Sequence, residues 1–427
     1  MDGFGRREFI ARGAAAVAAA MGAPGLAAAA GARGPRKLLD IGPGGVIAPG
    51  SAQDLRYAGN AGYLADTHTP WIRMWADWPS LQPHPDFAPG DPASPGHWRL
   101  VALDEQIRLA NARGLKVLLL PYRFPTWVNG TATLSARKDG DEEIAFRHDE
   151  RMSDASWQRY LRARRRPAAY LPRRRALEYL LPGDAYGPGS AWAGFFAFLY
   201  ARYHAGRRGS GPFVDAFELV NEPNLQLWPQ PGIAREVARL VKTAQAVSAR
   251  HAHSTLMLAP SISDDDAPSN RLYTRYDDFV PAFLDELAGL GYLAHSGQAW
   301  SHHNYTDVER RRTRTRTQLI RGLLAGRWTG YAEGGRAPTV FITEGGARLT
   351  QMPALYPDED PRRAQAKCLR DAYALHAPEG SAGTGVAMLA QYLLHADPNF
   401  DCGLLDPYPS TVKRPAYAAW KALPANA

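Results

Sequence analysis

The chain alternates short apolar segments with stretches of helical periodicity, and this alternation recurs along almost its whole length. Leu100, Leu103, Ile107 and Ala110 are spaced by three and four residues, as on the buried face of a helix. Gly114 ends this helical pattern, and an apolar run typical of a strand buried on both faces follows. We predict eight such strands, at residues 37–41, 71–75, 116–120, 216–220, 255–259, 298–301, 339–343 and 386–391.

Eight consecutive strand–helix units predict an α/β fold of one closed parallel barrel, the (β/α)8 or TIM barrel, over residues 33–427. A second helical stripe is expected at 233–247, and a last helix at 415–423. An open doubly wound sheet is the alternative. The first strand is followed by Gly42-Pro-Gly-Gly45, which lacks the spacing and the helix of a phosphate-binding loop, so the barrel is favoured.

One connection is much longer than the others. About 65 residues separate Tyr122 from the helix expected near Ala191, and they include an acidic DGDEE stretch and many Pro and Gly residues. Connections of this length in compact domains are usually functional or disordered. We predict an insertion at about 128–190, after strand 3, that shapes the substrate site. A flap without fixed structure is the alternative.

The formal net charge of +8 comes partly from two arginine-rich stretches, residues 162–175 and 310–316. Because no nucleic-acid recognition motif accompanies them, we interpret both as solvated basic faces and expect no nucleic-acid partner. An anionic substrate or cell-surface polymer remains an alternative.

The first 32 residues have the layout of a secretory signal. Paired arginines, Arg6 and Arg7, precede Glu8-Phe9-Ile10 and a weakly apolar, Ala-rich run that ends in small residues. This layout resembles the twin-arginine type of signal peptide and predicts a secreted or periplasmic protein. No later apolar run reaches the length of a bilayer span, so no membrane association is expected after signal removal.

Ionisable side chains are concentrated where predicted strands end. Because the carboxyl ends of parallel strands meet on one face of a barrel, these side chains should converge although they are far apart in sequence. Ionisable groups directly after apolar strands are costly unless they are solvated or functional. The four strand ends are Arg73–Trp78, Asn221-Glu222-Pro223, His302–Tyr305 and Thr343-Glu344-Gly345-Gly346.

Two glutamates facing each other across a barrel mouth suit the cleavage of a glycosidic bond. One must be protonated to give a proton to the leaving oxygen, and the other must be ionised to attack the anomeric carbon or to activate water. Glu222 and Glu344 are the candidates. The alternative is that both are solvated residues at strand ends.

These residues match the pattern of a large family group. The chain resembles the retaining (β/α)8 glycoside hydrolases that include cellulase-like family 5 and xylosidase-like family 39, which carry Asn-Glu after strand 4 and Glu after strand 7. The resemblance implies that Glu222 is the acid/base, that Glu344 is the nucleophile and that Asn221 hydrogen-bonds the sugar 2-hydroxyl. It extends over nearly the whole chain after the signal.

Three further residues match the same pattern. Arg73 corresponds to the strand 2 arginine that keeps the nucleophile ionised, and His303 and Tyr305 correspond to a His-x-Tyr motif after strand 6. The resemblance places Tyr305 beside Glu344. Asn-Glu-Pro alone is a weak signal, but its combination with these motifs in the expected order is specific.

The chain also departs from that pattern. Many family 5 members have a His after strand 3, where this chain has Tyr122-Arg123, and the usual Trp after strand 8 is replaced by Gln391-Tyr392. Trp75, Trp127 and Tyr392 are the candidates for stacking on a sugar, although each could equally belong to the core.

No metal or cofactor is predicted. Asp264-Asp265-Asp266 could bind a cation, but a polar approach to a helix is the favoured interpretation. Cys368 and Cys402 are expected to be structural or free, and their pairing stays open. The predicted partner is a carbohydrate or glycoside, which the protein hydrolyses. A transglycosidase with the same residues, or a carbohydrate-binding barrel without turnover, are the alternatives.

Overall fold

The computed structural model describes most of the chain outside the N-terminus and the long connection after strand 3. The predicted signal (1–32), Gly42–Gly45, the basic stretch 162–175 and nearly all of the insertion at 128–190 lie outside the described residues. The described residues are 35–41, 54–56, 58–125, 127–128, 187, 189–225, 232–251, 255–266, 268–269, 273–291, 298–311, 316–325, 327–328, 340–376, 385–397 and 400–425.

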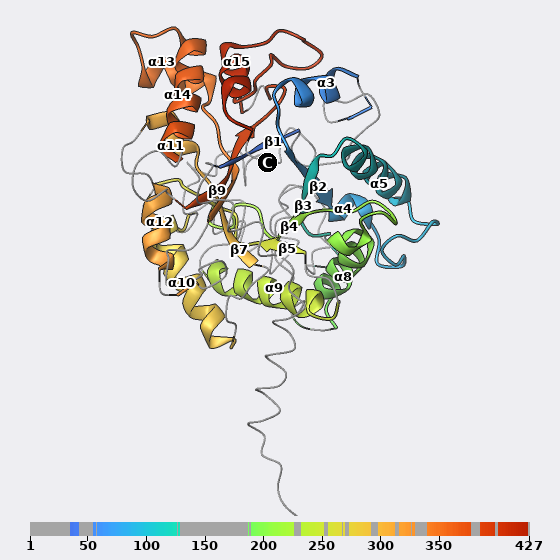
Figure 1. Ribbon diagram of the computed structural model, residues 1–427. Coiled ribbons are helices and arrows are strands. Elements are labelled where there is room, and N and C mark those ends of the chain that lie inside the picture. Colours follow the sequence, from blue (N-terminus) through green and yellow to red (C-terminus); the bar gives the residue numbers. More distant parts are fainter. Residues whose placement is uncertain are drawn as a thin grey trace, which may run out of the picture.

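Within these ranges, eight parallel strands form a closed barrel (Figure 1). The ring closes through two pairings, between β1 and β9 and between β5 and β7. A short segment, β6 (Ile262–Ser263), extends the fifth position of the ring and pairs with β7. The barrel strands are β1 (Arg36–Asp40), β2 (Trp71–Asp77), β3 (Lys116–Tyr122), β4 (Ala216–Glu218), β5 (Leu256–Leu258), β7 (Gln298–His303), β8 (Val340–Glu344) and β9 (Val386–Tyr392).

All eight predicted strands are confirmed, with ends that differ by at most two residues. The largest differences lie where the chain turns into the site. Regular pairing of β4 stops at Glu218, but the Leu219 N–H still donates to the Leu258 carbonyl, and Asn221 forms an isolated bridge to Ser261. The end of this strand is therefore irregular and still held by its neighbour.

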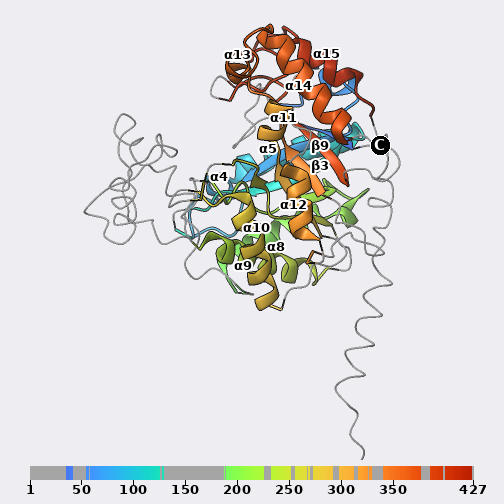
Figure 2. The same cartoon turned by 90° about the vertical axis from the view of Figure 1, so that its left-hand side faces the viewer.

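Helices surround the barrel on its outside (Figures 1 and 2). The predicted apolar stripes at 100–110 and 233–247 are confirmed as the buried faces of α5 and α9, and the predicted last helix as α15. The helices are α3 (Ala58–Asp66), α4 (Trp78–Leu81), α5 (His97–Ala112), α8 (Ala191–Tyr203), α9 (Ile233–Ser248), α10 (Tyr276–Gly289), α11 (Tyr305–Arg310), α12 (Arg316–Leu324), α13 (Met352–Leu355), α14 (Pro361–His376) and α15 (Pro415–Ala422).

The first and last of these helices lie side by side, as both views show (Figures 1 and 2). The Tyr417 hydroxyl of α15 donates to Asp66 of α3 at 2.7 Å. Lys37 of β1 is buried and donates to the carbonyls of Trp420 and Leu423 at the end of α15, at 3.0 and 3.1 Å. These contacts stabilise the junction where the last unit of the barrel meets the first.

The core has two layers. One cluster consists of strand residues alone, including Leu38, Trp71, Leu118 and Phe341, and fills the interior of the barrel. The larger cluster packs the outer faces of the strands against the helices. Burying each large apolar side chain contributes about 1.5–3 kcal/mol, so both layers stabilise the fold substantially. Among the described residues, none of the helices combines the length and hydrophobicity that a bilayer span requires.

Gly403, in the segment after β9, allows the backbone there to lie unusually close to the backbone of His395 and Ala396. A Cβ atom at this position would lie 2.7 Å from the carbonyl carbon of His395 and would also overlap the backbone of Ala396. We expect Gly403→Ala to lower the free energy of unfolding by about 1–3 kcal/mol, measured by urea denaturation. Gly194→Ala, in α8 with open space around it, should instead raise stability by about 0.5–1 kcal/mol. Equal effects of the two changes would contradict this packing.

Candidate active site

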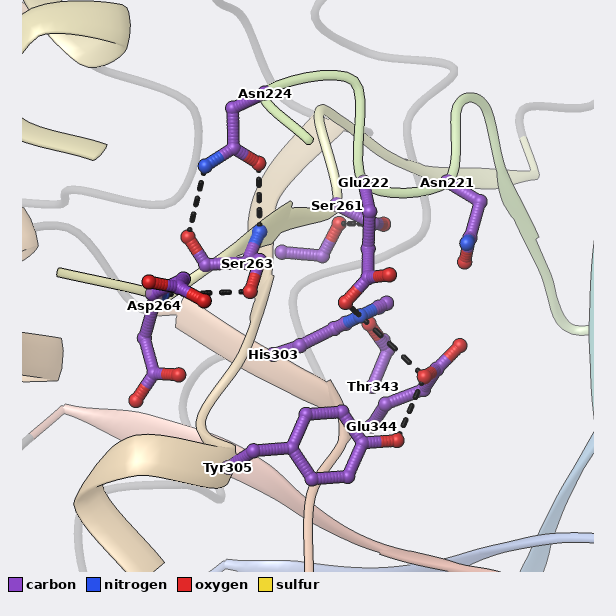
Figure 3. A network of polar contacts seen from close by, with 12 residues as sticks. Asn221, Glu222, Asn224, Ser261, Ser263, Asp264, His303, Tyr305, Thr343 and Glu344 are labelled. Atoms are coloured by element: carbon purple, nitrogen blue, oxygen red, sulfur yellow. Dashed lines mark hydrogen bonds and ion pairs between the residues drawn. The ribbon is translucent and has the colours of Figure 1, made fainter. Parts of the chain in front are cut away.

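The ends of separate strands bring their side chains together in one place (Figure 3). Glu222 and Asn221 follow β4, His303 is the last residue of β7, and Glu344 is the last residue of β8. Tyr305 begins α11, directly after β7. The predicted convergence of these residues is therefore present, although the glutamates are 344 − 222 = 122 positions apart in the sequence.

The turn after β4 determines where the Glu222 side chain points. Glu222 has φ = 44°, a left-handed conformation that is uncommon for a residue with a side chain. Its N–H donates to the Ser261 carbonyl at 2.7 Å. Asn224 holds the next part of the turn, because its side chain donates to the Ser263 carbonyl at 3.1 Å and accepts from the Ser263 N–H at 2.8 Å (Figure 3). The turn is thus fixed from both sides.

The two carboxyl groups lie close together, with His303 between them. Nδ1 of His303 is 2.9 Å from Oε1 of Glu222 and 3.4 Å from Oε2 of Glu344. One oxygen of each glutamate and a ring nitrogen of His303 all lie within 4.8 Å of one another. The Glu222 side chain is 16% exposed and that of Glu344 6%, so Glu222 is the more accessible of the pair to solvent.

Arg73 lies beneath this pair and has no exposed surface. Its Nε donates to Glu218 at 2.5 Å, and its Nη2 donates to Oδ1 of Asn221 at 2.9 Å. Its Nη1 donates to Asp40 at 3.0 Å and also contacts Oε1 of Glu344. Burial opposes the charge of the guanidinium, but these carboxylates together raise the pKa of Arg73 well above its ordinary value.

Tyr305 holds the other oxygen of Glu344. Its hydroxyl donates to Oε2 at 2.8 Å (Figure 3). Burial and the nearby Glu344 raise the pKa of Tyr305 far above its ordinary value, so the hydroxyl keeps its proton and acts as a donor. Arg73 and Tyr305 therefore each fix one of the two oxygens of Glu344.

Two carboxylates of the site were not singled out from the sequence. Glu218 accepts from Arg73 and from the Thr343 hydroxyl, both at 2.5 Å, and is fully buried. Asp40, the last residue of β1, accepts from Arg73 and from the Trp75 indole at 3.0 and 3.2 Å. A sequence signal did exist for Glu218, because it is a single charge within the apolar segment Phe217–Val220.

The three aromatic candidates lie in different surroundings. The guanidinium carbon of Arg73 lies 4.7 Å from the centroid of the Trp75 ring, and Trp75 makes an edge contact with Tyr122. Tyr392 packs edge-on against Tyr305 at 6.0 Å. Trp127 instead contacts the ring of Trp78 and donates to the Gln82 carbonyl, beside α4. Their stacking on a sugar stays a prediction.

Asp264 stabilises the start of the helix that carries Tyr305. Its two oxygens accept from the backbone N–H groups of Thr306 and Asp307, each at 3.0 Å. Burial and the neighbouring Asp307 raise the pKa of Asp264 to about 7. Asp266 contacts Arg316. The contacts of Asp264 therefore agree with the expectation that Asp264–Asp266 form a polar approach to a helix.

A cation could in principle be shared by Glu222, His303 and Glu344, since their atoms are close enough. The charges argue against this use. Glu344 is already paired with Arg73. Burial opposes an imidazolium, but Glu344, Glu218 and Glu222 raise the pKa of His303 to about 10, and a protonated ring cannot ligate a metal. Cys368 and Cys402 are both buried free thiols.

The charge of His303 should make the stability of the fold depend on pH. The pKa of His303 is about 10 when folded and about 6.5 when unfolded, so its contribution is complete below pH 6.5 and is lost towards pH 10. We expect the difference in unfolding free energy between wild type and His303→Asn to shrink by about 1.4 kcal/mol per pH unit between pH 7.5 and 9.5, measured by urea denaturation.

The adjacent histidine provides the control for this measurement. Burial lowers the pKa of His302 to about 3, so this ring is neutral at pH 7.5 and above. The difference between wild type and His302→Asn should therefore stay constant over the same pH range. A constant difference for His303→Asn as well would mean that His303 is neutral in the folded protein.

Comparison with known proteins identifies relatives of this fold. No family model and no curated protein sequence matches the chain. A family 39 glycoside hydrolase from the gut symbiont Bacteroides cellulosilyticus WH2 has a similar structure, with a TM-score of 0.50, 15% identity and 92% of this chain covered. The chain spans 64% of the length of that protein.

Two further solved structures are similar to a comparable degree. GH5_18 from Streptomyces cattleya, solved in complex with GlcNAc, has a TM-score of 0.51 at 16% identity, covering 91% of this chain and 79% of its own. A glucosidase from Croceicoccus marinus has a TM-score of 0.50 at 11% identity, covering 92% and 67%. The resemblance to glycoside hydrolases of families 5 and 39 is thus confirmed in the fold, which is the (β/α)8 barrel.

Proposed function

We propose that the chain is a retaining β-glycosidase that hydrolyses O-glycosidic bonds by double displacement. The observation that carries this proposal is the pair of glutamates at the barrel mouth, since one oxygen of Glu222 lies within 4.8 Å of one oxygen of Glu344. Retaining enzymes keep their two carboxyl groups about 5–5.5 Å apart, whereas inverting enzymes need about 6.5–9.5 Å to admit a water molecule. The short separation supports attack by a carboxylate.

Glu344 is the nucleophile in this proposal. Its oxygens are held by Arg73 and by the Tyr305 hydroxyl, so the carboxylate is oriented. In the first step one Glu344 oxygen forms a bond to the anomeric carbon while the glycosidic bond breaks. The product of this step is a glycosyl ester on Glu344.

Glu222 is the acid/base. Its carboxyl group contacts Nδ1 of His303, and the Glu222 side chain is more exposed than the Glu344 side chain. It gives its proton to the leaving oxygen in the first step. In the second step it takes a proton from the water that attacks the anomeric carbon, and Glu344 leaves as a carboxylate.

Asn221 is the proposed contact to the sugar 2-hydroxyl. Its Oδ1 accepts from Arg73, which fixes the orientation of the amide beside the glutamate pair. Hydrogen bonds to this hydroxyl strengthen in the transition state of glycoside cleavage. The substrate is therefore a β-linked carbohydrate or glycoside with a free 2-hydroxyl.

Trapping the glycosyl ester would test this mechanism directly. Incubation with a panel of activated 2-deoxy-2-fluoro β-glycosides should add the mass of one sugar to the intact protein, and peptide mapping should place it on Glu344. Glu344→Gln should form no adduct and should lose at least about 10³-fold in kcat, because the nucleophile is absent. An adduct on another residue would refute the assignment.

Glu222→Ala provides the second arm of the same experiment. It should lower kcat/KM by about 10²–10⁴-fold for a poor leaving group but much less for an activated one, which needs no proton. Equal losses for both leaving groups would contradict the acid role. Product analysis with an added sugar acceptor separates hydrolysis from transglycosylation.

We also propose that residues 1–32 direct export by the twin-arginine route, and that residues 33–427 form one catalytic domain. The paired arginines support this route, because the signal peptides that direct export by it contain such a pair. Replacing Arg6 and Arg7 together by Lys should leave the protein in the cytoplasm of a bacterial host, measured by cell fractionation. Arg12→Lys should be exported normally, and equal export of both variants would refute the proposal.

A further inference from the structure

Glu218 occupies a special position beneath the glutamate pair. It is the last residue of β4, four residues before Glu222, and its side chain points into the barrel with no exposed surface. It therefore contacts the rest of the site from below and has no access to a sugar at the barrel mouth. A buried carboxylate is costly unless other groups compensate its charge.

The compensation comes from a ring of alternating charges. Glu218 Oε2 is 2.5 Å from Nε of Arg73, and Arg73 Nη1 is paired with Glu344. Glu344 Oε2 is 3.4 Å from Nδ1 of His303. The ring closes because Nε2 of His303 is 3.9 Å from Oε1 of Glu218. Arg73 and His303 thus each lie between the same two carboxylates, Glu344 above and Glu218 below.

Hydroxyl groups from two separate strands of the barrel fix the Glu218 carboxylate in this ring. Thr343, in β8, donates to Oε1 at 2.5 Å, and Ser261, after β5, donates to the same oxygen. The Ser261 hydroxyl also lies 2.8 Å from that of Ser301 in β7. One oxygen of Glu218 is therefore held by hydroxyls and the other is directed at Arg73.

The carboxylates of the site differ in what happens to them during the proposed reaction. Glu344 loses its negative charge when it becomes an ester, and Glu222 gains and loses a proton. Burial opposes the charge of Glu218, but Arg73 and His303 lower the pKa of its carboxyl group to about 2, so it stays charged throughout. In the glycosyl-enzyme, Glu218 and Asp40 are then the carboxylates left in contact with Arg73.

We propose that Glu218 is a positioning residue, which keeps Arg73 aimed at Glu344 and keeps the proton on His303 through both steps of the reaction. This inference rests on the proposed glycosidase function. Glu218 does not touch the reacting atoms and acts through its two neighbours.

The charge of His303 depends on the titratable and charged groups that face it, so each of them matters for the test. The carboxylates around the imidazole of His303 favour its positive charge, and the neighbouring His302 is neutral. Removing one carboxylate should therefore make His303 lose its proton at lower pH. Among the residues that the structure describes, the titratable or charged ones around His303 are Glu218, Glu222, Glu344, Arg73, Tyr305 and His302.

The decisive variant is Glu218→Gln, which keeps the shape of the side chain and removes its charge. NMR of isotope-labelled histidine, with His303→Gln to assign the signal, should show the titration midpoint of His303 falling by more than about one unit. The value of kcat/KM per active site, with sites counted by the fluoroglycoside adduct, should fall about 10–100-fold, as for other residues that orient a reacting group through a partner.

Asp215→Asn is the matched control. Asp215 precedes β4 at the opposite end of the barrel, where it accepts from the Val117 N–H at 3.0 Å and pairs with Arg208 at 2.9 Å. Its replacement should change stability but neither the titration of His303 nor turnover per site. If Glu218→Gln behaves in the same way as Asp215→Asn, Glu218 is only a structural residue and the inference is overturned.

The variant Glu218→Asp separates the effect of charge from the effect of side-chain geometry. It also replaces Glu218→Gln in the test if that variant does not fold. It keeps a negative charge near His303, so the midpoint should stay within about half a unit of wild type, while the shorter side chain weakens the contact to Arg73 and lowers kcat/KM. A midpoint shift of more than one unit in this variant would overturn the inference. A wild-type protein without turnover would refute the proposed function, and the role of Glu218 in the reaction with it. The expected shift in Glu218→Gln would in that case still show that Glu218 keeps the proton on His303.

Discussion

The guanidinium of Arg73 has no contact with solvent, so its charge must be matched by side chains that other elements of the barrel deliver. Its partners come from β1, from β4 and the turn after it, and from β8. Leaving such a charge without partners costs several kcal/mol. The strands are therefore constrained in register at the level of Arg73, and the contacts that satisfy this requirement also build the candidate site. Stability and function share one set of interactions here.

The barrel explains how residues far apart in the sequence reach this shared centre. Each strand is followed by a crossover and returns parallel to its neighbours, so its carboxyl end always emerges at the same rim. The glutamates can then face each other while apolar residues fill the barrel below them. The candidate site is thereby confined to one end of the barrel. Asp215, at the other end of β4, makes only structural contacts among those described for it.

The strands and the rim could be predicted from the sequence because they depend on local pattern. The runs at 117–120 and 386–390 are apolar throughout, which is what a strand buried on both faces requires. Glu218 and Asp40 were missed for a physical reason. A charge inside or at the end of an apolar strand acquires its meaning from its neighbours in space, here Arg73, which is 33 residues from Asp40 and 145 from Glu218. The surroundings of Trp127 likewise depend on packing beside α4, which no periodicity reveals.

The position of Tyr305 depends on a second polar network, beside the first. Asp264 caps α11 through two backbone N–H groups, and Asp307 of the same helix accepts from the backbone of Arg316 at 2.9 Å, where α12 begins. The Thr317 hydroxyl, next in the chain, lies 2.8 Å from Nε2 of His302. The start of α11 is thus held from the β5 side and from α12, which fixes the Tyr305 hydroxyl 2.8 Å from Glu344. Because Arg73 holds one oxygen of Glu344 from below and Tyr305 holds the other from the side, neither network alone could determine the direction in which that carboxylate points.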